Sequence, residues 1–149
     1  MIVQDVSRTD AHIALKHALR RSDFELDVDV QIPATGITGL FGESGSGKTT
    51  LLRCIAGLEA GLSHDPRPVH KRGVGYVFQE PQLFPHLDVR RNIEFGLRRT
   101  SSNPIDQQQV IALLGLGDLL DRKPDGLSGG EAQRVAIASV LLRSPRLVL

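Results

Sequence analysis

The chain of 149 residues has a single cysteine, Cys54, so it cannot form an internal disulfide. That usage is typical of proteins from a reducing compartment such as the cytosol. Long apolar runs are also missing. The longest, Val135 to Leu142, is short and is interrupted by Ser139, so we expect no segment that spans a bilayer. The N-terminus has acidic residues early and no extended apolar stretch, which does not fit a secretory signal.

An excess of charge of either sign is lacking as well. Lysine and arginine total 18 and aspartate and glutamate 17, for a formal net charge of +1. This balance gives no general attraction to nucleic acid or to an anionic membrane, so we expect any membrane association to come through a partner. The length leaves room for one core without a second domain.

Residues Gly42 to Thr50 read GESGSGKTT and match the pattern G-x-x-x-x-G-K-[ST]. Glycines let consecutive backbone N–H groups point at phosphate oxygens, and the helix that follows adds the positive end of its dipole. The pattern predicts that Lys48 reaches the β- and γ-phosphates of a nucleotide and that the Thr49 hydroxyl holds Mg²⁺. A chance match is expected in about 1% of such chains. The candidate nucleotide-binding residues are Gly42, Glu43, Ser44, Gly45, Ser46, Gly47, Lys48, Thr49 and Thr50.

The flanking residues supply the strand and the helix that this loop needs. Ile37, Leu40 and Phe41 form a short apolar run before it. After it, the apolar residues within 51–56 recur at helical spacing until Gly57 ends the pattern. Earlier in the chain, 24–32 alternates apolar and polar residues and predicts a strand with one buried face. Residues 11–21 fit either a helix or a loop. Strands followed by a glycine loop and a helix predict an α/β fold.

Further along, residues 74–78 predict an apolar strand that ends at Gln79. Ligands of α/β sheets usually bind at the carboxyl ends of strands, although the spacing alone favours a surface glutamine after a strand for Gln79. A proline-rich loop and a helix over 89–97 are expected next. The polar stretch 100–109 predicts a loop, and 110–120 predicts a short apolar helix.

The stretch Leu127 to Arg134 reads LSGGEAQR and precedes an apolar helix that Pro145 ends. Ser128 and Glu131 have the spacing of a capping box. An ordinary capped helix explains both of these residues, but it gives no reason for Gly129 and Gly130, which cost helix stability. Glycines there leave the first N–H groups of the helix reachable, and this is the geometry of an anion site.

With GESGSGKTT, VGYVFQE and LSGGEAQRVAI in this order, the chain resembles the ATP-binding subunit of ABC transporters from roughly Phe24 onward. The resemblance implies an α/β phosphate-loop NTPase fold of the ABC type, incomplete at the C-terminus. It implies one partial domain over 1–149, with core motifs in 24–149, that takes ATP and Mg²⁺ as cofactors. Gln79 would join Thr49 as a Mg²⁺ ligand. The signature residues Ser128, Gly129, Gly130 and Glu131 would cap the γ-phosphate of ATP bound to a second copy.

The segments KRGVGYVFQEPQLFPHLDVRRNI and LLDRKPDGLSGGEAQRVAI look like the ATPase subunit of bacterial molybdate importers. That likeness implies a transport-coupled ATP hydrolase that works as a head-to-tail homodimer. It would sit in the cytoplasm, peripheral on the inner face of the cell membrane, through integral membrane permease subunits. A periplasmic binding protein would take part indirectly, and no nucleic acid is expected.

Four alternatives remain open at this point. Sulfate and polyamine importers share much of the LFPH-type segment. A soluble ABC-type ATPase working on DNA or ribosomes is disfavoured by the near-zero net charge. A phosphate-loop kinase has no need of LSGGE. A non-catalytic remnant that binds no nucleotide fits a chain that stops inside an expected parallel strand.

The sequence departs from the family pattern in four ways. RLVL stops before the family's Walker B aspartate and glutamate and before its switch histidine, so no catalytic residue is predicted in this chain. The stretch 57–75 is shorter than usual. Ala132 and Ser139 replace residues that are commonly basic or polar. No aromatic residue for adenine stacking is obvious, and Phe24 and His17 are the candidates.

We therefore expect this chain alone to release phosphate from ATP at or near the background rate. Without the aspartate Mg²⁺ loses a support, and without the glutamate no residue polarises the attacking water. A phosphate-release assay measures this directly. Steady release that disappears in the Lys48→Ala variant would contradict the expectation.

Overall fold

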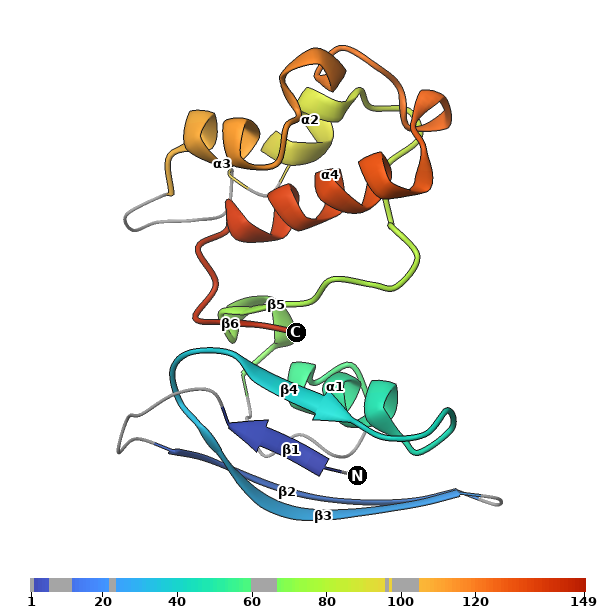
Figure 1. Ribbon diagram of the computed structural model, residues 1–149, viewed down its shortest axis with the longest axis vertical. Helices are drawn as coiled ribbons and strands as arrows, with labels where there is room; N and C mark the ends of the chain where they lie inside the picture. The colour runs from blue at the N-terminus through green and yellow to red at the C-terminus, as the bar shows by residue number, and fades with distance from the viewer. Residues whose placement is uncertain (1, 6–11, 22–23, 60–66, 96, 98–104) are drawn as a thin grey trace. The chain divides into compact units, whose positions relative to one another are not determined.

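The computed structural model describes residues 2–5, 12–21, 24–59, 67–95, 97 and 105–149 (Figure 1). Among these residues the strands pair as three two-stranded sheets: β1 with β4 and β2 with β3 antiparallel, and β5 with β6 parallel. The elements follow in the order β1 (Ile2–Asp5), β2 (His12–Arg21), β3 (Phe24–Pro33), β4 (Thr38–Phe41), α1 (Lys48–Ala56), η1 (Val69–Lys71), β5 (Val74–Gly75), α2 (Val89–Glu94), α3 (Gln107–Leu113), η3 (Gly117–Leu119), η4 (Pro124–Gly126), α4 (Gly129–Leu141) and β6 (Leu147–Val148).

Strand β3 follows the alternation predicted for 24–32. Leu26 and Val28 are buried, whereas Asp27 and Asp29 are exposed. The strand prediction is therefore confirmed, and Pro33 is its last residue.

The expectation of a helix or a loop over 11–21 is wrong, because β2 is a strand from His12 to Arg21. Its alanine, leucine and lysine residues favour a helix in isolation. However, β2 pairs with β3 along its whole length, and Leu15 is buried. Strand pairing and burial on one face outweigh the local helix preference.

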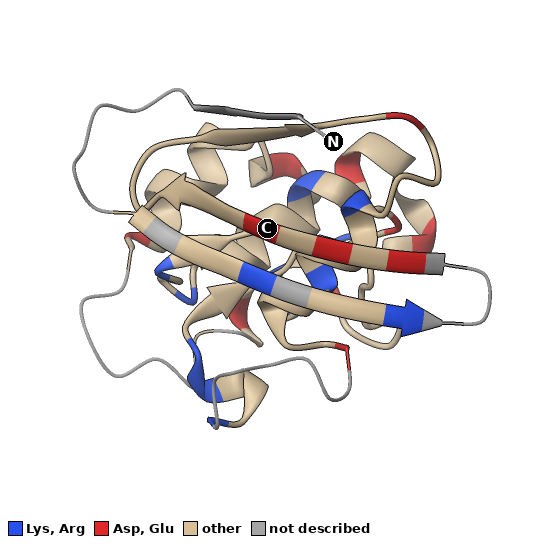
Figure 2. Cartoon of the chain, turned by 90° about the horizontal axis from the view of Figure 1, so that it is seen from below, with Lys and Arg blue, Asp and Glu red and all other residues tan. Residues whose placement is uncertain are grey.

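Charged residues recur along the paired strands of the hairpin, acidic on β3 and basic on β2 (Figure 2). Lys16 Nζ lies 3.0 Å from Asp29 Oδ2, and Arg20 Nη2 lies 3.2 Å from Glu25 Oε2. These pairs are exposed, so each contributes little to stability. The neighbouring carboxylate raises the pKa of Lys16 through a hydrogen bond and charge attraction.

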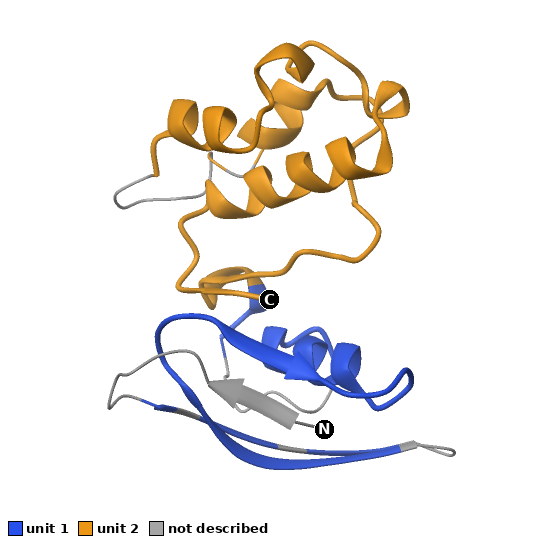
Figure 3. Cartoon of the chain, in the orientation of Figure 1, with its two compact units in different colours: residues 1–69 blue, residues 70–149 orange. Residues whose placement is uncertain are grey.

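The chain divides into two compact units, residues 1–69 and 70–149 (Figure 3). In the first unit, Leu26 and Val28 of β3 are buried together with Leu51 and Cys54 of α1. This core confirms the helical spacing expected after the loop, and it buries the single cysteine, Cys54. Helix α1 ends at Gly57, where φ is 75° and the N–H bonds back to the last turn.

The apolar run before the loop forms β4, as predicted, and pairs with β1. Leu40 packs against the core of this unit. Ile37 and Phe41 do not, since they are 79% and 57% exposed.

The second unit has a helical core built around α4. Residues of α2, α3, η3 and α4 and the loops beside them are buried together, namely Val89, Ile93, Val110, Leu116, Leu119, Val135, Ala138 and Leu142. None of the helices in the described part of the chain is long and apolar enough to cross a membrane.

Two helix predictions in this unit need correction at their ends. Helix α2 stops at Glu94, earlier than the expected 97. Helix α3 spans 107–113 and not 110–120, because Asp106 caps it by accepting a hydrogen bond from Gln108 N at 2.9 Å. Gly115, with φ at 60°, lies just beyond its end, and a short 3₁₀ turn follows.

Strand β5 is shorter than the predicted 74–78, since its partner β6 has only two residues. The pairing continues for one further bond, from Val77 N to Leu149 O at 2.8 Å. Gly75 allows β5 to lie close to the end of α4, because a Cβ there would overlap the Val140 side chain and reach Pro145 at 3.1 Å.

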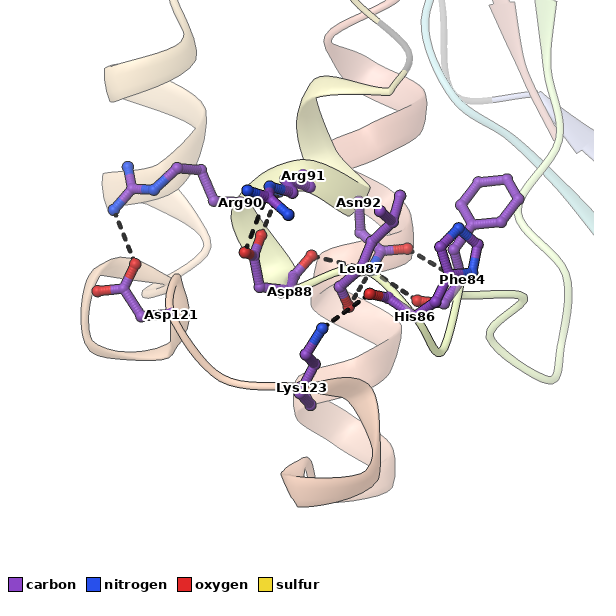
Figure 4. Close-up of polar contacts among 9 residues, drawn as sticks. All are labelled: Phe84, His86, Leu87, Asp88, Arg90, Arg91, Asn92, Asp121 and Lys123. Atoms are coloured by element: carbon purple, nitrogen blue, oxygen red, sulfur yellow. Dashed lines mark hydrogen bonds and ion pairs between the residues drawn. The ribbon is translucent and has the colours of Figure 1, made fainter.

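The loop before α2 is held by the buried side chain of Asn92 (Figure 4). Its Oδ1 accepts from Phe84 N at 2.7 Å, and its Nδ2 donates to the carbonyls of Phe84, Leu87 and Asp88 at 3.1, 3.2 and 2.9 Å. Lys123 Nζ donates to His86 O at 2.7 Å from the opposite side of the loop. One side chain thus fixes most of the polar backbone of 84–88.

We predict that Asn92→Ala lowers the free energy of unfolding by about 2–4 kcal/mol, because four hydrogen bonds to part-buried backbone groups of the loop are lost. Urea denaturation followed by circular dichroism measures the change. Arg90→Ala is the matched control on the same helix. It removes an exposed contact with Asp121 at 3.2 Å and should cost less than about 1 kcal/mol. An Asn92→Ala protein as stable as the control would contradict the prediction.

Candidate functional site

The loop between β4 and α1 turns on two glycines. Gly45 and Gly47 have φ angles of 82° and 89°, in the region that side chains with a Cβ rarely adopt. Ser46 N donates to Glu43 O at 3.2 Å, and this bond closes a turn over residues 43–46. Gly47 is the N-cap of α1 and offers no side chain to its N–H groups.

Helix α1 therefore begins with exposed donors. Its first helical hydrogen bond runs from Leu51 N to Gly47 O at 2.8 Å. The N–H groups of Lys48, Thr49 and Thr50 have no acceptor among the described residues. Uncapped N–H groups at a helix start favour an anion, and the helix dipole adds to that preference.

The side chain of Lys48 folds back over this loop. Its Nζ donates to Gly42 O at 2.9 Å and to Glu43 O at 2.6 Å, and lies 3.5 Å from Ser46 Oγ. An ammonium group has three donors and no acceptor, and these three contacts hold its positive charge over the loop. Thr49 is exposed next to it, with its hydroxyl on the first turn of α1.

Gln79 lies in the second unit, in a bend after β5, and is exposed. The backbone on its N-terminal side is fixed by two bonds. Val77 N donates to Leu149 O at 2.8 Å, and Phe78 O accepts from Gln133 Nε2 at 3.3 Å. Gln133 belongs to α4, so the segment that carries Gln79 is tied to the helix that Ser128 caps.

The start of α4 contains the capping box that the sequence indicated. Ser128 N donates to Glu131 Oε2 at 2.7 Å, and Glu131 N donates to Ser128 Oγ at 3.3 Å. The Ser128 hydroxyl also donates to Glu131 Oε2 at 2.7 Å. Gly129 and Gly130 are exposed, and their N–H groups have no acceptor in the described part of the chain. Helix α4 thus combines a closed capping box with two open donors.

These bonds change the acidity of the cap. The backbone N–H of Ser128 lowers the pKa of Glu131, and the Ser128 hydroxyl acts in the same direction. The positive charges of Arg122 and Arg134 add to this effect. The carboxylate is therefore held in its charged form at the mouth of the helix.

Sequence reasoning missed two residues of this unit. Gln133 bonds to backbone 55 residues away, and Asn92 bonds to the loop just before its own helix. Neither residue belongs to a spacing pattern. A polar residue on a half-buried position of an apolar helix is the one signal that points to Gln133.

The side chains of Phe24 and His17, the candidates for adenine stacking, lie outside the described part of the structure. Among the described residues, no group of three or more His, Cys, Asp or Glu is arranged to hold a metal ion.

Comparison with known proteins decides the family. Residues 26–149 match the family model described as ABC transporter. The chain belongs to the ABC transporter family. The α/β ABC-type fold expected from the sequence is confirmed by this match and by a solved structure. That structure is the dimeric ATP-binding cassette MJ0796 in a post-hydrolysis state bound to ADP and Pi. It has a TM-score of 0.68 and 25% identity over 91% of this chain and 71% of its own chain.

Several curated ABC proteins are more similar in sequence. The molybdenum import ATP-binding protein ModC of Methylococcus capsulatus is 56% identical over 140 residues, covering 85% of this chain and 39% of that protein. ModC 1 of Azotobacter vinelandii is 53% identical, covering 85% of this chain and 40% of its own length. ModC of Thiobacillus denitrificans is 50% identical, with coverage of 94% and 43%. This ABC chain spans about two fifths of the length of these relatives.

We predict that the Glu131 cap stabilises the fold at neutral pH and that acid removes its contribution. The folded chain binds the Glu131 proton less tightly than the unfolded chain does. The stabilisation is therefore present above the ordinary pKa of 4.5 and is lost as the pH falls through the lower folded value.

Urea denaturation of the wild type and of Glu131→Gln tests this across a pH series. The stability difference between the two proteins should be largest above about pH 5.5 and should shrink below about pH 3.5. Asp118→Asn, at an exposed carboxyl of η3, is the control. A difference that does not change with pH would contradict the prediction.

Proposed function

We propose that this chain is the ATP-binding part of an importer ATPase that energises the uptake of an inorganic oxyanion, with molybdate favoured. The observation that carries the proposal is the folded-back Lys48 ammonium over a loop whose helix begins with uncapped N–H groups. The molybdenum import proteins among the relatives support the choice of substrate.

The loop residues fit a nucleotide triphosphate. Backbone at Gly45 is open, since a Cβ there would meet nothing within 4 Å. The N–H groups that follow Gly47 and the Lys48 ammonium are all donors, and a phosphate chain offers only acceptors. Gly42 to Thr50 therefore bind the phosphates, and Lys48 neutralises part of their charge.

The metal site of the proposal uses oxygen ligands, as Mg²⁺ prefers. The exposed hydroxyl of Thr49 and the exposed side-chain amide of Gln79 supply them. When MgATP is bound, the Mg²⁺ ion offsets the negative charge of the phosphoryl group. The residues of this chain bind and orient the nucleotide, and water activation is assigned to none of them.

The open donors of Gly129 and Gly130 fit the γ-phosphate of ATP held by a second copy. In this arrangement two chains pair head to tail, and Ser128 to Glu131 of each complete the site of the other. The dimeric MJ0796 structure and the family membership support such pairing. Residues 1–149 act as one partial ABC-type domain with core motifs in 24–149, and the family model that runs through 26–149 supports this.

The remaining partners follow from the importer assignment. Permease subunits in the membrane hold the ATPase at the cytoplasmic face, and a periplasmic binding protein delivers the oxyanion. A net charge of +1 supports the absence of a nucleic-acid partner. A sulfate or polyamine importer would use the same site with a different permease.

We predict that saturating MgATP raises the melting temperature of the chain by about 5 °C, because a ligand that binds only the folded state stabilises it. Lys48→Ala should remove this shift, since the ammonium that contacts the phosphates is gone. Lys71→Ala, an exposed lysine of η1, is the matched control and should keep the shift. A wild-type chain with no shift would favour the non-catalytic remnant.

A further inference from the structure

The residue immediately before Gln79 is held from α4. Gln133 Nε2 donates to Phe78 O at 3.3 Å, across 55 residues of sequence. The C=O of Phe78 and the N–H of Gln79 share one planar peptide unit. A bond that fixes the carbonyl therefore fixes the plane from which the Gln79 Cα and its side chain extend.

Two other contacts restrain the chain between β5 and Phe78. Val77 N bonds to Leu149 O at 2.8 Å, one residue beyond the paired β5 and β6. The Tyr76 and Phe78 rings also meet edge to face, with centroids 4.8 Å apart. These contacts fix the chain up to Phe78, but only the Gln133 amide holds the Phe78 carbonyl among the described residues.

The oxygen of the Gln133 amide adds no hydrogen bond to α4 among the described residues. This atom, Oε1, is buried and has no hydrogen-bond partner in the described part of the chain. A buried acceptor without a donor disfavours the folded state, whereas a leucine of similar size avoids that penalty. The hydrogen bond that Nε2 donates to Phe78 O is therefore the contact that gives the amide a role.

We propose that Gln133 is a positioning residue that orients Gln79 by holding the Phe78 carbonyl. This inference rests on the proposed role of Gln79 as a Mg²⁺ ligand. Gln133 lies five residues after Ser128 on the same helix, so the signature segment and the Mg²⁺-binding glutamine are joined within the second unit. The orientation of Gln79 then depends on the position of α4, even though Gln133 touches neither ion nor nucleotide.

The test is a double-mutant cycle on the full chain, with a fluorescent ATP analogue as the probe. Gln133→Leu should raise the Mg²⁺ concentration for half-maximal binding by roughly tenfold, as loss of a supporting residue behind a metal ligand does. Gln79→Ala should raise it by at least as much. The double variant should match Gln79→Ala. In EDTA, the affinity of Gln133→Leu for the analogue should stay within about twofold of the wild-type affinity, because Gln133 acts only through the metal ligand.

Two further variants distinguish a positioning role of Gln133 from a purely structural one. Gln133→Glu keeps the size of the side chain but has no N–H to donate, so it should behave like Gln133→Leu. Gln109→Leu, at an exposed glutamine of α3, should leave the Mg²⁺ requirement unchanged. Water can replace the amide at Phe78, which is exposed, so Gln133→Leu should melt close to the wild type. In the metal-free chain the Gln79 amide resonances should shift in both Gln133 variants.

Three outcomes overturn the inference, and they are distinguishable. A normal Mg²⁺ requirement in both Gln133 variants, with a raised one in Gln79→Ala, removes the inference and leaves the proposed function standing. Additive effects in the double variant show that Gln133 acts independently of Gln79. An unchanged Mg²⁺ requirement in Gln79→Ala removes the metal role of Gln79 and the inference with it, while binding through Lys48 is decided by the melting experiment.

Discussion

The contact between the Lys48 ammonium and the carbonyls of Gly42 and Glu43 is the interaction on which the account of this chain depends. It draws the long side chain back over its own loop and places a positive charge beside the uncapped start of α1. The charge, the left-handed glycines and the open N–H groups are all local to one turn of chain. The positive charge and the open N–H groups favour an anion, and the glycines let the backbone take the shape of this loop.

The two helix starts of the candidate site meet the same requirement differently. Helix α1 has a glycine as its N-cap and leaves its donors open. Helix α4 closes part of its start with Ser128 and Glu131 and keeps only the N–H groups of Gly129 and Gly130 open. The capping box gives α4 stability of its own, while α1 relies on the buried Leu51 and Cys54 and on Lys48. Both helix starts thus keep some N–H groups without an acceptor among the described residues.

Patterns within a few residues of sequence were predictable, and contacts across the chain were not. The glycine loop, the alternation in β3 and the Ser128 cap depend on neighbours within one or two turns, so their spacing reveals them. Strand β2 was missed because its pairing with β3 outweighs the helix preference of its residues. Gln133 carries no spacing signal, since it acts on backbone that only the fold brings near. The bonds of Asn92 are local, but they follow no spacing pattern that could be recognised in the sequence. The binding roles of Lys48, Gln79 and Ser128 to Glu131 stay predictions.

The most direct test of the central claim is to follow the backbone amide resonances of the chain during a titration with MgATP. If the loop binds the phosphates, the amides of Gly45, Gly47 and Lys48 shift to a saturating end point, and the same resonances stay in place in Lys48→Ala. Amides of the exposed hairpin β2–β3 provide the internal reference. Loop resonances that move no further than those of the hairpin would contradict the claim that this chain binds ATP at Gly42 to Thr50.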